Sequence, residues 1–206
     1  MDKILSFVVA AVLAGTPLLF GTLGEIVTEK SGNLNLGVEG MMFMGGVAGL
    51  AGSYYYEQAV ANPNPVVSVL IAMVCAILCA AFGALIYSVL TITLRANQNV
   101  TGLALTIFGT GFANFLGEAI GNTAPSRYMA VGNVTKNAFN SGIPGLQDLP
   151  VVGKLLFSYN FMVYLGIILA IVLAWFLGRS RAGLNLRAVG ENPATADAAG
   201  INVTLY

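Results

Sequence analysis

Five long apolar runs, separated by mostly short polar segments, make up most of the chain. Each run is long enough to form a helix that crosses the roughly 30 Å hydrocarbon core of a bilayer. The expected spans lie near residues 4–24, 34–53, 66–94, 100–120 and 159–178. The pattern therefore predicts an all-α, polytopic integral membrane protein with about five transmembrane helices.

The first run has Lys3 near its start and is interrupted by Gly15 and Pro17. A cleaved signal peptide is the alternative interpretation. The run continues well past a typical signal sequence, however, and no clear small-x-small site closes it. A spanning helix kinked at its proline fits better.

The second run carries six glycines among twenty residues, and small residues at that density let helices approach closely in lipid. In the polar break before it, Ser31–Asn33 is expected to turn. Tyr54, Tyr55 and Tyr56 follow the run as an expected aromatic anchor at a membrane surface. The third run, 66–94, is long enough to span with a tilt.

Composition supports a membrane protein, since 57% of the residues are hydrophobic and 9% are charged, against about 25% charged in soluble domains. The net charge is zero and no basic run occurs, so nothing points to nucleic acid. Histidine is absent, which removes the commonest metal ligand and the usual general base. Cys75 and Cys79 lie in an apolar run as small hydrophobic residues, too few for a zinc site. We therefore expect no catalytic residue, no metal and no cofactor.

Three arginines follow the fifth run, at Arg179, Arg181 and Arg187, and make that end cytoplasmic by the positive-inside rule. Five spans then place the amino terminus outside. The polar segment 121–158 is expected outside too, as a re-entrant or surface-packed excursion with a short apolar piece near Val151.

Two groups of polar residues within or beside the apolar runs are candidates for a translocation path. Glu39 lies about one turn into the second run, after Asn33 and Asn35. The alternatives are that Glu39 bonds to a neighbouring helix or to interfacial water, and that both asparagines only form a turn.

The second group lies on the fourth run, where Thr106, Thr110, Asn114 and Glu118 follow at steps of four and share one helix face. Such a face avoids lipid. It serves either for hydrogen bonds between helices or to line the path of a polar solute. Neutral donors and acceptors suit sugars and nucleosides, because they bind without trapping the solute by charge.

The stretch Arg187–Val203 predicts a short helix of about two turns. Asn192 suits its N-cap, Pro193 its first position, and Gly200 the position just past its end. A helix this short is unstable alone in water, so other elements must hold it. It is either an ordinary connector between spans or a docking element for a soluble partner. The chain has no phosphate-binding loop motif, so any ATP would be bound elsewhere.

Three ordered stretches resemble permeases of ATP-binding cassette importers, in the ribose and nucleoside (basic membrane lipoprotein-linked) branch. They are EIVTEKSGNLNLGVEGMMFMGG, ANQNVTGLALTIFG and GLNLRAVGENPATADAAGINV. The resemblance implies that residues 179–203 form a cytoplasmic coupling loop whose helix docks on an ATPase. The residues that match this coupling loop are Gly190, Glu191, Asn192, Pro193, Ala196 and Gly200.

The resemblance also implies an importer in the cell membrane, with two permease subunits, two ATPases and an extracellular solute-binding lipoprotein. Such permeases continue about a hundred residues past this loop, so the chain resembles the front half of one, truncated after Tyr206. Nucleosides are favoured as solute, with simple sugars as the alternative. A partner-independent secondary transporter or channel, and a bare membrane scaffold, are the hypotheses from other classes.

Overall fold

The computed structural model describes residues 2–123, 129–140 and 159–205, and all regular structure in these ranges is helical. The prediction of an all-α membrane protein is confirmed. The chain forms two compact units. One consists of Met1–Asn35 with Gly142–Tyr206, and the other of Leu36–Ser141.

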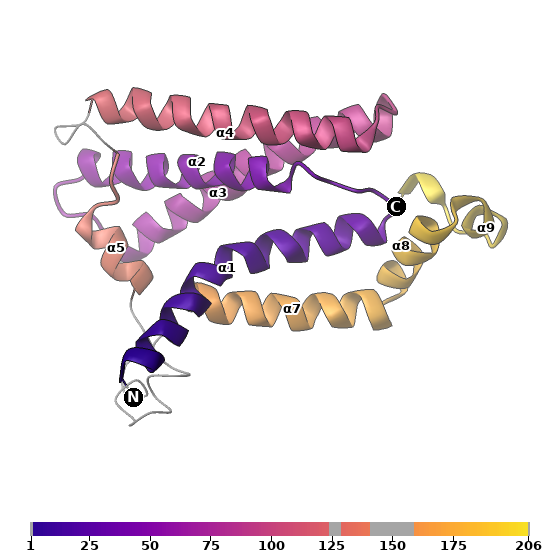
Figure 1. Ribbon diagram of the computed structural model, residues 1–206, viewed down its shortest axis with the longest axis horizontal. Coiled ribbons are helices and arrows are strands. Elements are labelled where there is room, and N and C mark those ends of the chain that lie inside the picture. Colours follow the sequence, from indigo (N-terminus) through magenta and orange to yellow (C-terminus); the bar gives the residue numbers. More distant parts are fainter. Residues whose placement is uncertain (1, 124–128, 141–158, 206) are drawn as a thin grey trace. The chain divides into compact units, whose positions relative to one another are not determined.

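The terminal unit, Met1–Asn35 with Gly142–Tyr206, pairs the first long helix with the last one (Figure 1). Its described elements are α1 (Asp2–Lys30), α7 (Phe161–Arg179), α8 (Arg181–Glu191), α9 (Pro193–Ala198) and the 3-10 turn η2 (Val203–Leu205). Gly166 of α7 packs on Leu19 and Phe20 of α1. Pro17 lies inside α1, and this helix is bent in Figure 1. Proline removes one helical hydrogen bond, which accounts for a bend.

Helix α1 is longer than the predicted span at 4–24, because it continues through the polar residues to Lys30. It ends at the predicted turn, where Gly32 has φ +88°. The amide of Gly32 donates to the Glu29 carbonyl at 3.0 Å, and that of Asn33 to the Thr28 carbonyl at 3.1 Å. This is a Schellman cap, whose left-handed residue is usually glycine.

The central unit, Leu36–Ser141, is organised around α2, which packs against both α3 and α4. Its described elements are α2 (Val38–Ala59), α3 (Pro65–Ser88), the π-helical turn η1 (Val89–Thr93), α4 (Gln98–Thr123) and α5 (Asn133–Asn140). The predicted third run thus ends in a π-helical turn. Residues 121–123 continue α4, although they were expected to begin the polar excursion.

Glycines let α2 lie against α3, as the sequence predicted. A Cβ on Gly45 would lie 3.0 Å from the Ala76 carbonyl oxygen, and one on Gly49 would lie 2.9 Å from that of Ala72. The earlier glycine of α2 thus meets the later alanine of α3, and the later glycine meets the earlier alanine, so the two helices are antiparallel. The spacing of four residues between these glycines is the small-xxx-small pattern of close helix pairs in membranes.

Four described helices are long and apolar enough to cross a membrane, and they match four of the five predicted spans. They are Ile4–Lys30, Pro65–Thr93, Gln98–Asn122 and Phe161–Arg179. The predicted second span corresponds to α2, which begins at Val38 rather than at residue 34 and extends to Ala59. The three tyrosines belong to this helix instead of following it.

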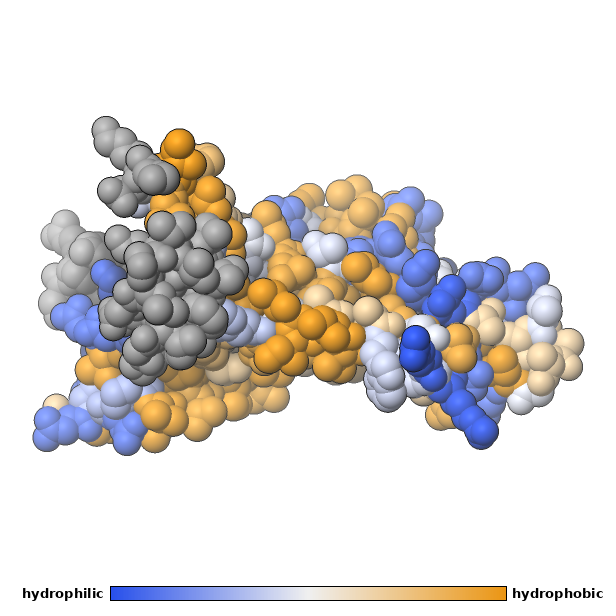
Figure 2. Space-filling view, turned by 90° about the horizontal axis from the view of Figure 1, so that it is seen from below, coloured by the Kyte–Doolittle hydropathy of each residue, from blue (hydrophilic) through white to orange (hydrophobic). Residues whose placement is uncertain are grey.

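Within the predicted polar excursion 121–158, α5 is a described helix that packs on α3. The apolar piece near Val151 lies outside the described residues. Figure 2 shows many hydrophilic side chains over α8 and α9, at the right of the view.

Candidate functional site

The crossing of α2 and α4 is a backbone-to-backbone contact. A Cβ on Gly40 would lie 2.7 Å from the Cα of Thr106, and one on Gly109 would lie 2.6 Å from the Cα of Gly40. No side chain separates the helices here. Glu39 and Thr110 each lie one residue from this crossing, so two predicted path residues flank it.

Helix α4 carries the predicted polar face as one stripe. Thr106 and Thr110 are half-buried, whereas Asn114 and Glu118 are exposed in the single chain. The Thr106 hydroxyl donates to the Leu36 carbonyl at 2.8 Å, a bond between segments. The Thr110 hydroxyl donates to the Thr106 carbonyl at 2.9 Å, within its own helix. The first part of the stripe therefore takes part in hydrogen bonding between segments, which was one of the two interpretations. Its last part is exposed in the single chain, and its role in lining a solute path stays a prediction.

Glu39 is exposed in the first turn of α2, where the positive end of the helix dipole favours a carboxylate. Asn33 belongs to the turn after α1, where its side-chain amide donates to the Ser31 hydroxyl at 3.4 Å. Asn35 is 7% exposed, and its backbone amide donates to Glu25 Oε1 at 2.9 Å. These contacts favour the turn interpretation of the two asparagines.

The predicted short helix after the arginines is α9, and its caps are as expected. Asn192 accepts from the Thr195 amide at 3.0 Å, and Pro193 holds the first position. At the other end Gly200 has φ +83°. The Gly200 amide donates to Asp197 at 2.9 Å, and the Ile201 amide donates to Ala196 at 3.0 Å. A second Schellman cap thus closes this helix.

Helix α8 differs from the expectation, since the sequence predicts a loop over these residues and the structure has a helix. Ser180 forms its N-cap: the hydroxyl donates to the Phe176 carbonyl at 2.7 Å and accepts from the Gly183 amide at 2.9 Å. A Cβ on Gly183 would lie 2.8 Å from the Cα of Leu177, so the corner between α7 and α8 is tight. The serine directly after Arg179 was the available signal, since serine favours N-caps.

The hairpin α8–α9 (Arg181–Ala198) has a small core and a broad exposed surface. Val189 is 7% exposed and Ala196 is 3% exposed. Glu191, Asn192, Pro193 and Gly200 are all exposed. Of the residues matched to the coupling loop, Ala196 therefore faces the hairpin's own core.

Gly190 has a different surrounding from the other residues of this group, since it packs on the end of α1. A Cβ on it would lie 2.8 Å from the Gly32 amide nitrogen and 2.9 Å from the Lys30 carbonyl carbon. The hairpin is thereby held by α1 as well as by α7. Helix α9 in turn packs on α8, and this packing supplies the support that so short a helix requires.

A cluster that the sequence did not indicate joins α2, α3 and α5. Glu57 Oε1 accepts from the Thr135 amide at 2.8 Å and also from the Thr135 hydroxyl. That hydroxyl is hydrogen-bonded to the Ser68 hydroxyl. Thr135 and Ser68 are 1% and 0% exposed. The carboxylate caps the first turn of α5, and no sequence signal could pair residues 78 positions apart.

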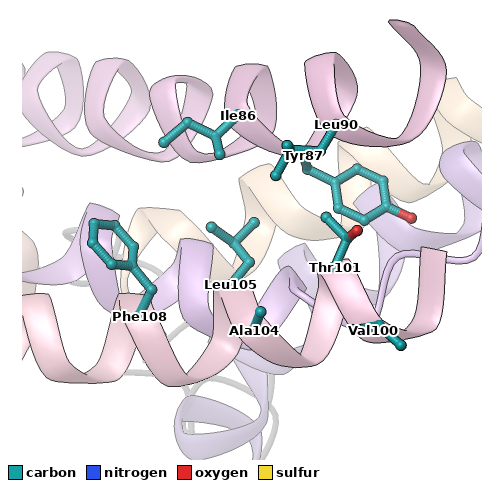
Figure 3. Close-up of a pocket in the computed structure, with 8 residues that line it drawn as sticks. All are labelled: Ile86, Tyr87, Leu90, Val100, Thr101, Ala104, Leu105 and Phe108. Carbon is teal, nitrogen blue, oxygen red and sulfur yellow. The ribbon is translucent and has the colours of Figure 1, made fainter. Parts of the chain in front are cut away.

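An apolar groove of about 370 Å³ lies between α3 with η1 and the first half of α4 (Figure 3). Its lining residues are Ile86, Tyr87, Leu90, Val100, Thr101, Ala104, Leu105 and Phe108. Tyr87 and Thr101 bring the only side-chain oxygens, and both lie toward one end of the groove. Few polar groups line it, so it does not suit a sugar or a nucleoside.

A family model described as "Branched-chain amino acid transport system / permease component" matches residues 6–206. The chain belongs to this family of membrane permeases. Among the described residues, no three metal-binding side chains of the His, Cys, Asp or Glu type lie together.

Three curated relatives give a closer comparison. The guanosine ABC transporter permease protein NupQ of Bacillus subtilis is 36% identical over 98% of this chain. The nucleoside ABC transporter permease protein NupC of Lactococcus lactis is 33% identical over 98% of it. The putative glucose ABC transporter permease protein TsgC13 of Haloferax volcanii is 34% identical over 94%.

The chain spans 61%, 61% and 54% of the lengths of NupQ, NupC and TsgC13. No solved structure matches. The resemblance drawn from the three sequence stretches, to ABC importer permeases, is confirmed. The family description names branched-chain amino acids while these relatives name nucleosides and glucose, so family membership does not fix the solute.

Proposed function

We propose that this chain belongs to the permease subunit of an ATP-driven importer in the cell membrane, and that the imported solutes are nucleosides. Two of the named relatives, at 36% and 33% identity, are described as guanosine and nucleoside permeases. The observation that carries the coupling role is the α8–α9 hairpin, which is capped, anchored on α1 and exposed at Glu191 and Pro193. In this proposal a partner ATPase binds the hairpin and hydrolyses the ATP.

The proposed topology has five spans, with the amino terminus outside and the hairpin in the cytoplasm. Helices α1 and α7 run in the same direction (Figure 1), since Gly166 near the start of α7 packs near the middle of α1, and α7 leads into α8, whose Gly190 packs at the end of α1. If both helices run from outside to inside, the chain must return to the outside between them. It must therefore cross the membrane an odd number of times between the end of α1 and the start of α7. In the described part of the chain between them, helices α2, α3 and α4 would supply three, which supports α2 as a span although it is less apolar than the others. Its 22 residues give roughly 33 Å at about 1.5 Å per residue.

Solute would pass beside the α2–α4 crossing, with Glu39, Thr110, Asn114 and Glu118 as the bordering residues. The exposure of Glu39, Asn114 and Glu118 in one chain supports this assignment. A second permease subunit would cover these side chains, and an extracellular lipoprotein would deliver the solute. Asn33 and Asn35 would position the chain between α1 and α2 rather than touch solute.

The docking role is tested by disulfide crosslinking of the full-length permease to its ATPase. Cys75 and Cys79 are first replaced by alanine, and one cysteine is then introduced at exposed Ala198. We expect Ala198→Cys to crosslink to a cysteine in the groove of the ATPase. The matched control is Ala196→Cys, two residues away on the same helix but 3% exposed, which should not react. An assembled, ATP-hydrolysing complex that gives no crosslink at position 198 would contradict the proposal.

A simple sugar is the second candidate solute, because the putative glucose permease TsgC13 is as similar as the nucleoside permeases. Uptake of labelled guanosine into proteoliposomes, competed by other nucleosides or by glucose, separates the two. We expect nucleosides to compete and glucose not to. Uptake driven by an ion gradient without ATP or ATPase would instead favour a secondary transporter.

A further inference from the structure

The apolar groove between α3 with η1 and α4 lies entirely within the central unit, and its lining belongs to helices long and apolar enough to cross the membrane. It opens at the surface of the chain, since Val100 is 65% exposed and Phe108 is 52% exposed. Its floor is buried, since Tyr87 and Leu105 are each 5% exposed and pack in one cluster with Met41. A groove on spanning helices is surrounded by hydrocarbon, so the part of a ligand that fills it must be apolar.

The groove has a polar end and an apolar end (Figure 3). The hydroxyls of Tyr87 and Thr101 lie toward one end, and Phe108 lies toward the other. The volume of about 370 Å³ holds roughly twelve groups of the size of a water molecule, at about 30 Å³ each. A methylene group is of similar size, so one lipid acyl chain fits. A whole α-helix, about 10–12 Å in diameter, does not fit inside the groove.

The short connection between η1 and α4 follows the polar end of the groove and carries Arg95. The Leu94 amide donates to the Val89 carbonyl at 3.0 Å. The Ala96 amide donates to the Leu90 carbonyl at 2.9 Å. Because Leu90 lines the groove, these bonds fix the backbone of Arg95 close to the polar end. Arg95 has φ +53°, a left-handed conformation that is uncommon for residues with a Cβ and that gathers at binding sites.

Arg95 is the only charged residue between Glu57 and Glu118 in the sequence. Its side chain is exposed where two long apolar helices end, which is the level of lipid headgroups. Basic side chains at this level attract anionic lipids. A cation and two hydroxyls at one end of an apolar groove therefore complement a molecule with an anionic headgroup and an acyl chain.

We propose that this groove binds one acyl chain of an anionic phospholipid from the bilayer, with Arg95 holding the headgroup phosphate. The Tyr87 and Thr101 hydroxyls then lie where the acyl chain meets the polar headgroup. Helices α3 and α4 each pack on α2 more than on one another, so a lipid chain between them fills space that the protein leaves open. The site depends on neither the solute nor the ATPase, and it goes beyond the proposed function.

The first test measures which phospholipids the full-length permease retains, by native mass spectrometry after release from nanodiscs with equal amounts of phosphatidylglycerol and phosphatidylethanolamine. We expect one tightly retained phosphatidylglycerol per chain. Ala104→Phe fills the groove from its exposed edge and should lower this retention about tenfold. The matched control is Ala84→Phe, at an exposed alanine of α3 outside the groove lining, which should retain the lipid as the wild type does. Equal retention in wild type and Ala104→Phe would overturn the proposal.

The headgroup contact is tested by Arg95→Gln in the same nanodiscs. The preference for phosphatidylglycerol over zwitterionic phosphatidylethanolamine should disappear, because the positive charge that attracts an anionic lipid is lost. Arg95→Lys keeps the charge and should keep the preference. A preference that survives in Arg95→Gln would remove Arg95 from the site and overturn the proposal as stated.

The second test separates a lipid in the groove from a protein segment that covers it. A photoreactive phenylalanine analogue is placed at exposed position 100 of the full-length permease in nanodiscs. We expect its crosslink to phosphatidylglycerol, measured as the mass added to the peptide that contains this position. A crosslink to another spanning helix or to a second permease copy would show a protein interface and would overturn lipid binding here. Neither test measures uptake or ATPase binding, so failure of the lipid site would leave the proposed function standing.

Discussion

At the α2–α4 crossing, Gly40 lies against the backbone of Leu105, Thr106 and Gly109, and its φ is that of an ordinary helix. At the end of α9, Gly200 has nothing within 4 Å of a Cβ placed on it, yet its φ is +83°. At Gly40, an added side chain would have no room. At Gly200 there is room, but a Cβ would disfavour the left-handed backbone conformation. Two glycines that look alike in the sequence should therefore respond differently to the same substitution.

The largest effect is expected for Gly40→Ala. The added methyl group would meet backbone atoms of α4, which cannot move aside as a side chain can, so the two helices must separate. Overpacking typically costs about 1–3 kcal/mol, and we expect the upper end here. The free energy of unfolding in mixed detergent micelles should fall by about 3 kcal/mol.

The matched control is Gly46→Ala on the same helix, where nothing lies within 4 Å of the added Cβ. Alanine is the better helix former by about 0.5–1 kcal/mol, so this variant should be as stable as the wild type or slightly more stable. Equal losses for Gly40→Ala and Gly46→Ala would show that helix propensity, rather than the crossing, sets the stability.

The long elements could be predicted because their signal is local. The apolar runs for α3, α4 and α7 match their helices closely, and the Asn192, Pro193 and Gly200 caps of α9 follow from residues a few positions apart. The sequence does not predict the extension of α1 to Lys30, because the polar residues 24–33 indicate a break between two spans. Glu25 and Glu29 are good helix formers, and the actual stop is the left-handed Gly32.

The candidate site was only partly predictable, because much of it depends on contacts between distant positions. The steps of four in α4 predicted one face, but not that Thr106 would bond to the Leu36 carbonyl, 70 residues away. Gly190 could be assigned to a coupling loop by resemblance, yet its packing on Gly32 needs the fold. Glu57 and Thr135 carry no local pattern at all.

A smaller effect is expected at the second kind of glycine, in Gly200→Ala. Left-handed backbone costs an alanine about 1–2 kcal/mol relative to glycine, and nothing else at this position changes. The free energy needed to open the Schellman cap should fall by that amount, which would be measured as faster amide exchange at Gly200 and Ile201. Gly200→Asn, which tolerates this conformation better, should lose less. If alanine and asparagine lost the same amount, side-chain bulk rather than φ would be responsible, and the contrast with Gly40 would fail.

The smallest effect is expected for Asn192→Ala, at the opposite end of α9. The substitution removes the acceptor of the Thr195 amide but leaves Pro193 and the Schellman cap in place. Loss of an N-cap costs about 1 kcal/mol. Exchange at Thr195 should rise accordingly, while the core of the α2–α4 crossing keeps its protection. Asn192→Asp preserves the cap and adds a charge that the helix dipole favours, so it should restore exchange to the wild-type rate. If Gly40 or Gly109 lost protection in Asn192→Ala, the hairpin cap and the α2–α4 crossing would unfold together as one cooperative element. The contrast between the glycines at the two places would then not come from two independent sites.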